Sequence, residues 1–196
     1  CPSFLEVLKG NAFDQFYHEH HSYFSLTSFK NLLEKNGLRL FDVEYKPVHG
    51  GTYRFFACHL ENEHAEMTEN VTKWHYEEKL FGVDSYETLK KRMIKMKNNM
   101  NEISKYLQML KEDGKKVIGY GATAKFIQVS NMCNLNSELI DFVVDTTVDK
   151  QNKYTPKSNI KIIPYDMDVL DDIDFCFLGA WNYRDEIIKK EKSFLK

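Results

Sequence analysis

The second half of the chain alternates strand-like and helix-like stretches, and this alternation constrains the fold more than any other feature. From Lys115, "KKVIGYGATAKFIQVSNM" is typical of a buried strand, a glycine turn and a helix. The stretches "LIDFVVD", "NIKIIPY" and "DFCFLGAW" follow as short strands, and "NYRDEIIKKEKSFLK" follows as a closing helix. Strands alternating with helices favour a parallel sheet, because each crossover returns the chain to the same end of the sheet. We therefore expect a Rossmann-like domain over residues 114–196.

Residues 1–113 show a different pattern. "LRLFDVEY" and "TYRFFACHL" are strand-like, and the glycines of "HGG" between them can adopt the positive φ of a tight turn. A short helix is expected through "SFKNLLEKNG" with Thr27 or Ser28 as its cap, and another over residues 68–79. A longer helix opens at Asp84 or Ser85, with an apolar seam expected to pack on another helix of the same subunit. The predicted class is α/β, with an α+β segment, a β-hairpin and long helices before the Rossmann-like domain.

Composition excludes several classes of protein. The chain has 196 residues, of which 42% are hydrophobic, enough to bury a core. A net charge of -2 argues against a nucleic-acid binder, and the longest apolar runs are too short for a membrane span. The four cysteines lie far apart, which disfavours a zinc cluster or a secreted disulfide framework and fits a reducing cytoplasm. A soluble cytoplasmic protein is expected, and its start at Cys1 without Met indicates part of a longer chain.

The glycine turn "GYGATAK" is a candidate anion site. Gly119 and Gly121 follow the expected strand, Ala124 takes the third fingerprint position, and the helix behind them presents free N–H groups. Asp145 ends the next strand, where a dinucleotide fold keeps its ribose-binding acid, so spacing alone predicts NAD binding. The alternative is that the glycines only let strand and helix pack closely. Lys125 adds a charge that packing does not require.

The window "FYHEHHSYF" has three interpretations. A helical zinc site of the HExxH type is disfavoured, because His18, His20 and His21 lack the required spacing. An extended strand would place His18 and His20 on one face and Tyr17, Glu19 and His21 on the other, as ordinary half-buried residues. The same residue types could instead remove a proton next to a ketone, with histidine as base and tyrosine holding the oxyanion.

The stretch "HGGTYR" is a weaker candidate site. His49 and Arg54 flank its glycines, and the guanidinium of Arg54 offers a bidentate fork to a phosphate. Both residues could equally border a simple hairpin. The sequence leaves these alternatives open.

Five motifs in order carry a family resemblance: "FDQFYHEHHSYFSLTSF", "VHGGTYRFF", "GYGATAK", "VDTTVDKQNKYTP" and "LGAWNYRDEI". Together they resemble the C-terminal portion of the S-adenosylmethionine-dependent sugar C-methyltransferases. The resemblance implies methylation at C-3 of a nucleotide-linked 4-keto-6-deoxy sugar, with S-adenosylmethionine bound by an N-terminal domain absent from this sequence. It assigns His20 as general base, Tyr17 to the keto or enolate oxygen, and Glu19 to orienting the sugar or the histidine. These three side chains can meet only if a turn interrupts the window.

The resemblance also implies a set of substrate-binding residues: His18, His49, Gly50, Gly51, Thr52, Arg54, Gly119, Gly121, Ala122, Lys125, Trp181 and Asn182. No metal site is expected. The expected partner is the nucleotide-linked keto sugar, without nucleic acid or membrane, and a homo-oligomer is compatible with the sequence. Thr52 stands where the family commonly has Ser, and Lys157 stands where a glycine is usual, so substrate identity is left open. The alternatives are a non-catalytic sugar-nucleotide-binding module and an NAD-dependent oxidoreductase.

Overall fold

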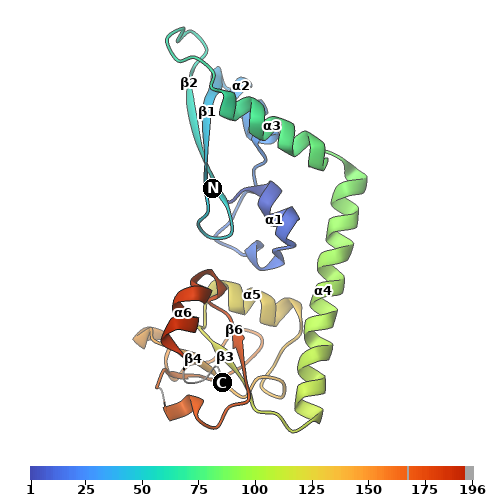
Figure 1. Ribbon diagram of the computed structural model, residues 1–196, viewed down its shortest axis with the longest axis vertical. Coiled ribbons are helices and arrows are strands. Elements are labelled where there is room, and N and C mark those ends of the chain that lie inside the picture. Colours follow the sequence, from blue (N-terminus) through green and yellow to red (C-terminus); the bar gives the residue numbers. More distant parts are fainter. Residues whose placement is uncertain (167, 193–196) are drawn as a thin grey trace. The chain divides into compact units, whose positions relative to one another are not determined.

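The computed structural model describes residues 1–166 and 168–192 and confirms the predicted mixed α/β class (Figure 1). The chain forms two compact units. Unit 1 contains Cys1–Phe13 and His18–Met96, and unit 2 contains Asp14–Tyr17 and Lys97–Lys196. The short segment 14–17 therefore belongs to unit 2, although the sequence on both sides of it belongs to unit 1.

Unit 1 is built on an antiparallel hairpin. Strands β1 (Leu38–Lys46) and β2 (Thr52–His59) pair along their length, with a register shift near Asp42. The turn between them takes positive φ at three successive residues, His49, Gly50 and Gly51. One face of the hairpin packs into an aromatic and aliphatic core, where Phe29 stacks on Phe55 and Trp74 on Tyr45. The buried members of this core are Leu26, Leu33, Leu40, Val43, Tyr53 and Val71.

Three helices complete most of unit 1: α1 (Phe4–Gly10), α2 (Leu26–Glu34) and α3 (Glu69–Phe81). The 3₁₀ turn η1 (Phe13–Gln15) follows α1. Helix α2 begins earlier than predicted, because Ser25 is its cap and not Thr27 or Ser28. Ser28 is the third residue of a capping box, in which the hydroxyls of Ser25 and Ser28 each accept the other residue's backbone N–H at 3.0 Å.

Helix α4 (Tyr86–Glu112) runs from unit 1 into unit 2 and is 27 residues long. Its predicted apolar seam is buried at Met96, Leu107 and Leu110, but Tyr86 and Met93 are 72% and 41% exposed. The prediction of a seam packed along its whole length is therefore wrong, because a stripe is buried only where another element covers it. Among the residues that the structure describes, no helix is both long and apolar enough to cross a membrane.

Unit 2 contains a parallel sheet in the order β5-β4-β3-β6. The chain moves outward from β3 through β4 to β5 and then returns to the other side of β3 for β6. Loops therefore diverge at the carboxyl end of β3, where open α/β sheets bind ligands. The strands are β3 (Val117–Tyr120), β4 (Val143–Asp145), β5 (Ile162–Pro164) and β6 (Phe175–Leu178).

Two helices and three short 3₁₀ turns connect and close this sheet. Helix α5 (Ala124–Met132) follows β3, and α6 (Arg184–Lys190) is the closing helix. The predicted closing helix reached residue 196, and its residues 193–196 lie outside the described part of the chain. The 3₁₀ turns are η2 (Val148–Lys150), η3 (Asp168–Leu170) and η4 (Trp181–Tyr183).

A buried carboxylate links α3 to the start of α2. Glu78 is 1% exposed and accepts the backbone N–H groups of Leu26 at 2.5 Å and Thr27 at 3.0 Å. The Thr27 hydroxyl donates to the same carboxylate at 3.0 Å. A negative charge at a helix N-terminus satisfies free N–H groups and complements the helix dipole.

Replacement of Glu78 by Gln should lower the free energy of unfolding by about 1–3 kcal/mol, because buried N–H groups lose a charged acceptor. Urea denaturation followed by circular dichroism measures this change. Glu77→Gln is the matched control, since Glu77 is 41% exposed and its ion pair with Lys9 spans 3.7 Å. The control should change stability by less than about 0.5 kcal/mol, and equal effects of both variants would contradict the capping role.

Candidate active site

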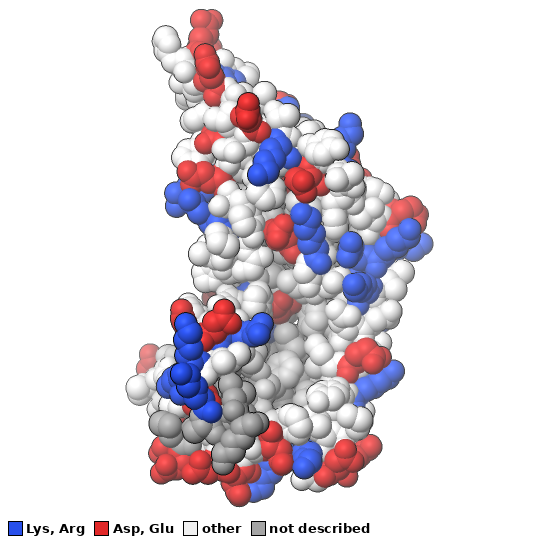
Figure 2. All heavy atoms as spheres, viewed as in Figure 1, with Lys and Arg blue, Asp and Glu red and all other residues white. Residues whose placement is uncertain are grey.

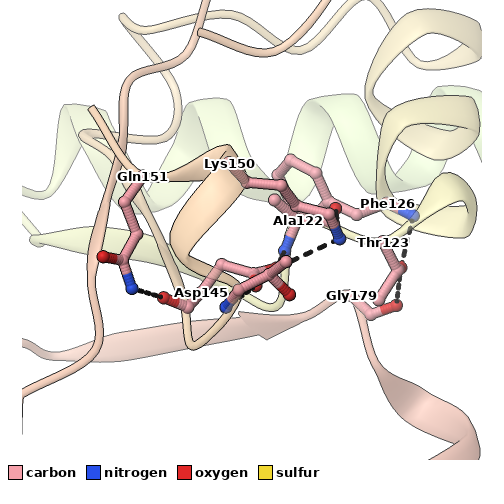
Figure 3. A network of polar contacts seen from close by, with 8 residues as sticks. Ala122, Thr123, Phe126, Asp145, Lys150, Gln151 and Gly179 are labelled. Carbon is pink, nitrogen blue, oxygen red and sulfur yellow. Dashed lines mark hydrogen bonds and ion pairs between the residues drawn. The ribbon is translucent and has the colours of Figure 1, made fainter. Parts of the chain in front are cut away.

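Asp145, at the end of β4, organises the loops at the carboxyl end of the sheet (Figure 3). Its two carboxylate oxygens accept the backbone N–H groups of Ala122 and Thr147, each at 2.7 Å. The Lys150 Nζ atom lies 3.6 Å from the carboxylate and donates to the Ala122 carbonyl oxygen at 3.0 Å. The Gln151 amide donates to the Asp145 carbonyl oxygen at 3.0 Å. One side chain therefore fixes the turn after β3 and the loop after β4.

The ionisation of Asp145 reflects these contacts. Burial alone would raise the pKa of this carboxyl group. Hydrogen bonds from Thr147 and Ala122 and the charge of Lys150 outweigh burial, so the pKa lies below its ordinary value. The group is therefore a carboxylate at neutral pH, with each oxygen engaged by the protein's own backbone.

The glycine turn is shaped by packing. A Cβ atom on Gly119 would lie 2.8 Å from the Phe126 ring and 2.9 Å from Val143, so β3 and α5 approach too closely for a side chain. Gly121 has φ +86° and leaves room for Ala180. Gly119 therefore has the packing role that the sequence left as an alternative.

Thr123 caps the N-terminus of α5 and joins two loops. Its hydroxyl oxygen accepts the Phe126 N–H at 3.1 Å and donates to the Gly179 carbonyl oxygen at 2.7 Å (Figure 3). The turn after β3 is thereby tied to the loop after β6. These are the two neighbouring strands at which the sheet order reverses.

A pocket of about 390 Å³ lies at this end of the sheet. Three tyrosines, Tyr120, Tyr165 and Tyr183, give it an aromatic wall. Its charged lining residues are the cations Lys150 and Lys190 and the anions Asp145 and Glu186. The Lys190 Nζ atom lies 3.4 Å from the centre of the Tyr165 ring. The remaining lining residues are Gly121, Thr123, Val144, Thr146, Thr147, Ala180 and Ile187.

Surface charge elsewhere gives no broad basic field on the face drawn in Figure 2, where side chains of both signs are interspersed. An anionic ligand that approaches this face would therefore depend on individual lysines and not on a broad positive field.

A buried glutamate supports the tyrosine wall. One Glu191 oxygen accepts the hydroxyl protons of Tyr120 and Tyr165, each at 2.7 Å. Burial, followed by the hydrogen bond to Glu191, raises the pKa of Tyr120 far above its ordinary value. Tyr120 and Tyr165 are thus held as neutral hydrogen-bond donors in fixed orientations.

Two of the predicted substrate residues, Lys125 and Trp181, contact Asp14. The Trp181 indole Nε1–H donates to Asp14 Oδ2 at 2.6 Å, and Lys125 Nζ lies 3.6 Å from the same oxygen. The Lys125 Nζ atom also lies 4.4 Å from the centre of the Trp181 ring. Asn182 follows Trp181 within η4. All of these residues belong to unit 2.

The window around the histidines is not a strand, so the extended interpretation is wrong. Residues 17–19 form a bend and turn, as needed if Tyr17, Glu19 and His20 are to act together. Tyr17 is the last residue of the segment in unit 2, whereas His18, Glu19 and His20 belong to unit 1. His18 and Glu19 are exposed, and the His20 ring packs edge-on to Tyr23 at 6.1 Å.

The "HGGTYR" residues, His49, Gly50, Gly51, Thr52 and Arg54, form the hairpin turn and the start of β2 in unit 1. A Cβ atom on Gly51 would lie 2.7 Å from the Glu6 side chain, so close packing requires this glycine. The Thr52 hydroxyl donates to the Val48 carbonyl oxygen at 3.1 Å. The Arg54 side chain is 62% exposed and pairs with Glu44 at 3.3 Å.

Several pocket residues were missed by the sequence reasoning. Tyr165 directly follows β5, and Lys150 follows β4, so the rule that ligands bind beyond the carboxyl ends of strands could have found both. Tyr120 ends β3, so the same rule could have found it, whereas Tyr183 and Lys190 had no such signal because their side chains reach the pocket only after folding. Within residues 1–166 and 168–192, no three His, Cys, Asp or Glu side chains are grouped as a metal site would need.

Sequence comparison identifies the class of protein. A family model described as the C-methyltransferase C-terminal domain matches residues 47–196, and the chain belongs to this family. The chain is also 38% identical over 195 residues to the C-methyltransferase NovU of Streptomyces niveus. That match covers 100% of this chain and 46% of NovU, so the chain spans less than half the length of this relative. The predicted relationship to the C-terminal portion of C-methyltransferases is confirmed.

Asp145→Asn should lower the free energy of unfolding at pH 7 by about 1.5–3 kcal/mol, because a charged acceptor of two backbone N–H groups is lost. A carboxyl group whose pKa is lowered by folding stabilises above its unfolded pKa of about 3.9 and loses that contribution as pH falls through the folded value. The difference between wild type and variant should therefore shrink below pH of about 4.

Urea denaturation at several pH values measures this dependence. Asp149→Asn, at an exposed aspartate in the adjacent η2, is the control and should show no comparable difference. A stability difference that stays constant with pH would contradict the proposed role of the Asp145 charge.

Proposed function

We propose that this chain is the acceptor-binding and proton-abstracting part of an S-adenosylmethionine-dependent C-methyltransferase that acts on a nucleotide-linked 4-keto-6-deoxy sugar. The observation that carries the proposal is that a chain of the C-methyltransferase C-terminal family has a tyrosine- and lysine-lined pocket at the switch point of its sheet. The resemblance carried by the five sequence motifs is the reason for proposing a nucleotide-linked sugar as the methyl acceptor.

The pocket suits a nucleoside diphosphate. Lys150 and Lys190 both line it and offer positive charge to a diphosphate. Tyr165 donates its hydroxyl proton to Glu191, so its oxygen is left at a fixed position to accept a hydrogen bond from the sugar or the base. Tyr183 is 54% exposed and offers an aromatic face to a base. The proposed substrate supplies the matching groups, which are a base, a diphosphate and a polar sugar.

The proposed chemistry is removal of a proton from the carbon next to the ketone. His20 takes this proton and the C–H electron pair moves into the enolate. The enolate carbon would then bond to the methyl group while the bond between that methyl group and the donor's sulfonium sulfur breaks, its electron pair staying on sulfur. Tyr17 donates a hydrogen bond to the oxygen on which negative charge develops, and Glu19 orients the sugar or the imidazole. The turn over residues 17–19 supports this assignment, because a flat strand would direct Tyr17 and His20 to opposite faces.

S-adenosylmethionine would supply a methyl group made electrophilic by its sulfonium. Asp145, at the end of β4, is poorly placed to bind the ribose of an adenosyl group. Both of its carboxylate oxygens accept backbone N–H groups, and the residue is 7% exposed. We therefore assign the methyl donor to a part of the longer protein outside this chain. The same contacts weigh against the alternative of an NAD-dependent oxidoreductase, which needs Asp145 for the ribose hydroxyls.

Calorimetric titration with dTDP, UDP, GDP and CDP should show saturable binding of one nucleoside diphosphate, with NAD and S-adenosylmethionine as negative controls. Lys190→Ala should weaken that binding by about tenfold or more, since a charge-assisted contact to phosphate is lost. Lys189→Ala, at the exposed neighbouring position, is the matched control and should bind nearly as well as wild type. Binding of NAD alone would contradict the proposed function.

His20→Ala in the full-length protein should reduce kcat for methyl transfer by about 10²–10⁴-fold, the usual contribution of a general base. His21→Ala removes the adjacent exposed imidazole and should leave kcat nearly unchanged. Transfer at the wild-type rate by His20→Ala would favour the alternative of a non-catalytic binding module.

A further inference from the structure

Asp14 is the centre of a cluster in unit 2 to which the proposed reaction assigns no role, and in this cluster Asp14 and Lys125 are buried while Trp181 is 37% exposed. Asp14 is 7% exposed and accepts the Trp181 indole N–H at 2.6 Å. Its second partner, Lys125, lies in α5 and is also 7% exposed. Asp14 is separated from Trp181 by 167 positions in the sequence, so this contact joins the N-terminal segment to the Rossmann-like part of the chain.

The negative charge of Asp14 holds Lys125 in this cluster. The buried Nζ atom lies 3.6 Å from Asp14 and 4.4 Å from the centre of the Trp181 ring, and within residues 1–166 and 168–192 no acceptor lies at ordinary hydrogen-bond distance from it. Burial lowers the pKa of Lys125, and the charge of Asp14 opposes that shift. Without the carboxylate, a buried cation would lose its counter-charge.

A buried ion pair gives little stability compared with apolar packing, and its best-attested use is to specify one arrangement. Here the ion pair would specify the placement of a very short segment, Asp14–Tyr17, in unit 2. Within the first 96 residues, unit 2 contains Asp14–Tyr17, and the chain returns to unit 1 at His18. Gln15 is 2% exposed, and its carbonyl oxygen accepts the Tyr17 N–H at 3.0 Å, so the segment is compact from Asp14 to Tyr17.

We propose that Asp14 is a positioning residue whose contacts with Trp181 and Lys125 hold residues 14–17 on unit 2 and thereby set the position of Tyr17. We call these two contacts the clamp. Lys125 and Trp181, expected from the resemblance to bind substrate, serve in the clamp by holding the side chain of Asp14. The consequence for catalysis rests on the proposed function, because it requires Tyr17 to bind the developing oxyanion. The clamp itself can be tested without any substrate.

Hydrogen exchange of the 196-residue chain tests the clamp. The chain has two tryptophans, so Trp181→Phe identifies the Trp181 indole resonance in an NMR spectrum. Asp14→Ala should speed exchange of that indole N–H and of the backbone amides of residues 15–17 by about tenfold or more. Asp113→Ala, at an exposed aspartate of unit 2, is the matched control and should leave both rates unchanged. Unchanged exchange in Asp14→Ala would overturn the clamp.

Asp14→Asn covers the case in which Asp14→Ala does not fold. Asparagine keeps an acceptor for the indole and removes the charge that faces Lys125. The indole should then stay protected, while Lys125→Met added to Asp14→Asn should restore thermal stability lost in the single variant. Absence of this rescue would overturn the paired role of Asp14 and Lys125.

Methyl transfer by the full-length protein tests the link to Tyr17. Asp14→Ala should lower kcat by about tenfold to 10²-fold with little change in KM, because misplacement by about 1 Å can cost about 10²-fold. Faster exchange with an unchanged kcat would overturn the positioning role and leave the proposed function intact. If the wild-type protein transferred no methyl group, the proposed function and the link to Tyr17 would both fail. The hydrogen-exchange rates alone would then decide whether Asp14 holds residues 14–17.

Discussion

The carboxylate of Asp145 is the contact on which the rest of the ligand-binding end of unit 2 depends. It accepts one N–H from the turn after β3 and one from the loop after β4, and Lys150 balances its charge. Thr123 then extends the connection to the loop after β6. A single buried anion therefore supplies hydrogen-bond acceptors to two loops at once, and residues of these loops line the pocket.

The same contacts explain why a dinucleotide-like fingerprint need not bind a dinucleotide. The spacing of the glycines and of Asp145 follows from β3, its turn and β4, which many Rossmann-like domains share. In this chain Gly119 makes room for Phe126, and Asp145 is used by the protein's own backbone. Function must therefore be argued from the side chains that face the pocket, among them Tyr165, Lys150 and Lys190.

The N-terminal window shows how a short segment can link two compact units. Asp14–Tyr17 belongs to unit 2, and the residues after it belong to unit 1. The proposed reaction divides its groups in the same way, with Tyr17 on one unit and Glu19 and His20 on the other.

The sequence by itself determined the α/β class, the hairpin and the alternating strands of unit 2, because periodicity and glycine positions report local backbone preference. It left the histidine window open between a strand and a turn, and the turn was expected only if Tyr17, Glu19 and His20 share the roles that the resemblance implies. Only the tertiary structure decided that Asp14 pairs with Lys125 and Trp181, and that Tyr120 and Tyr165 share Glu191. These contacts join residues up to 167 positions apart, and no local pattern encodes which distant partner a buried charge will meet.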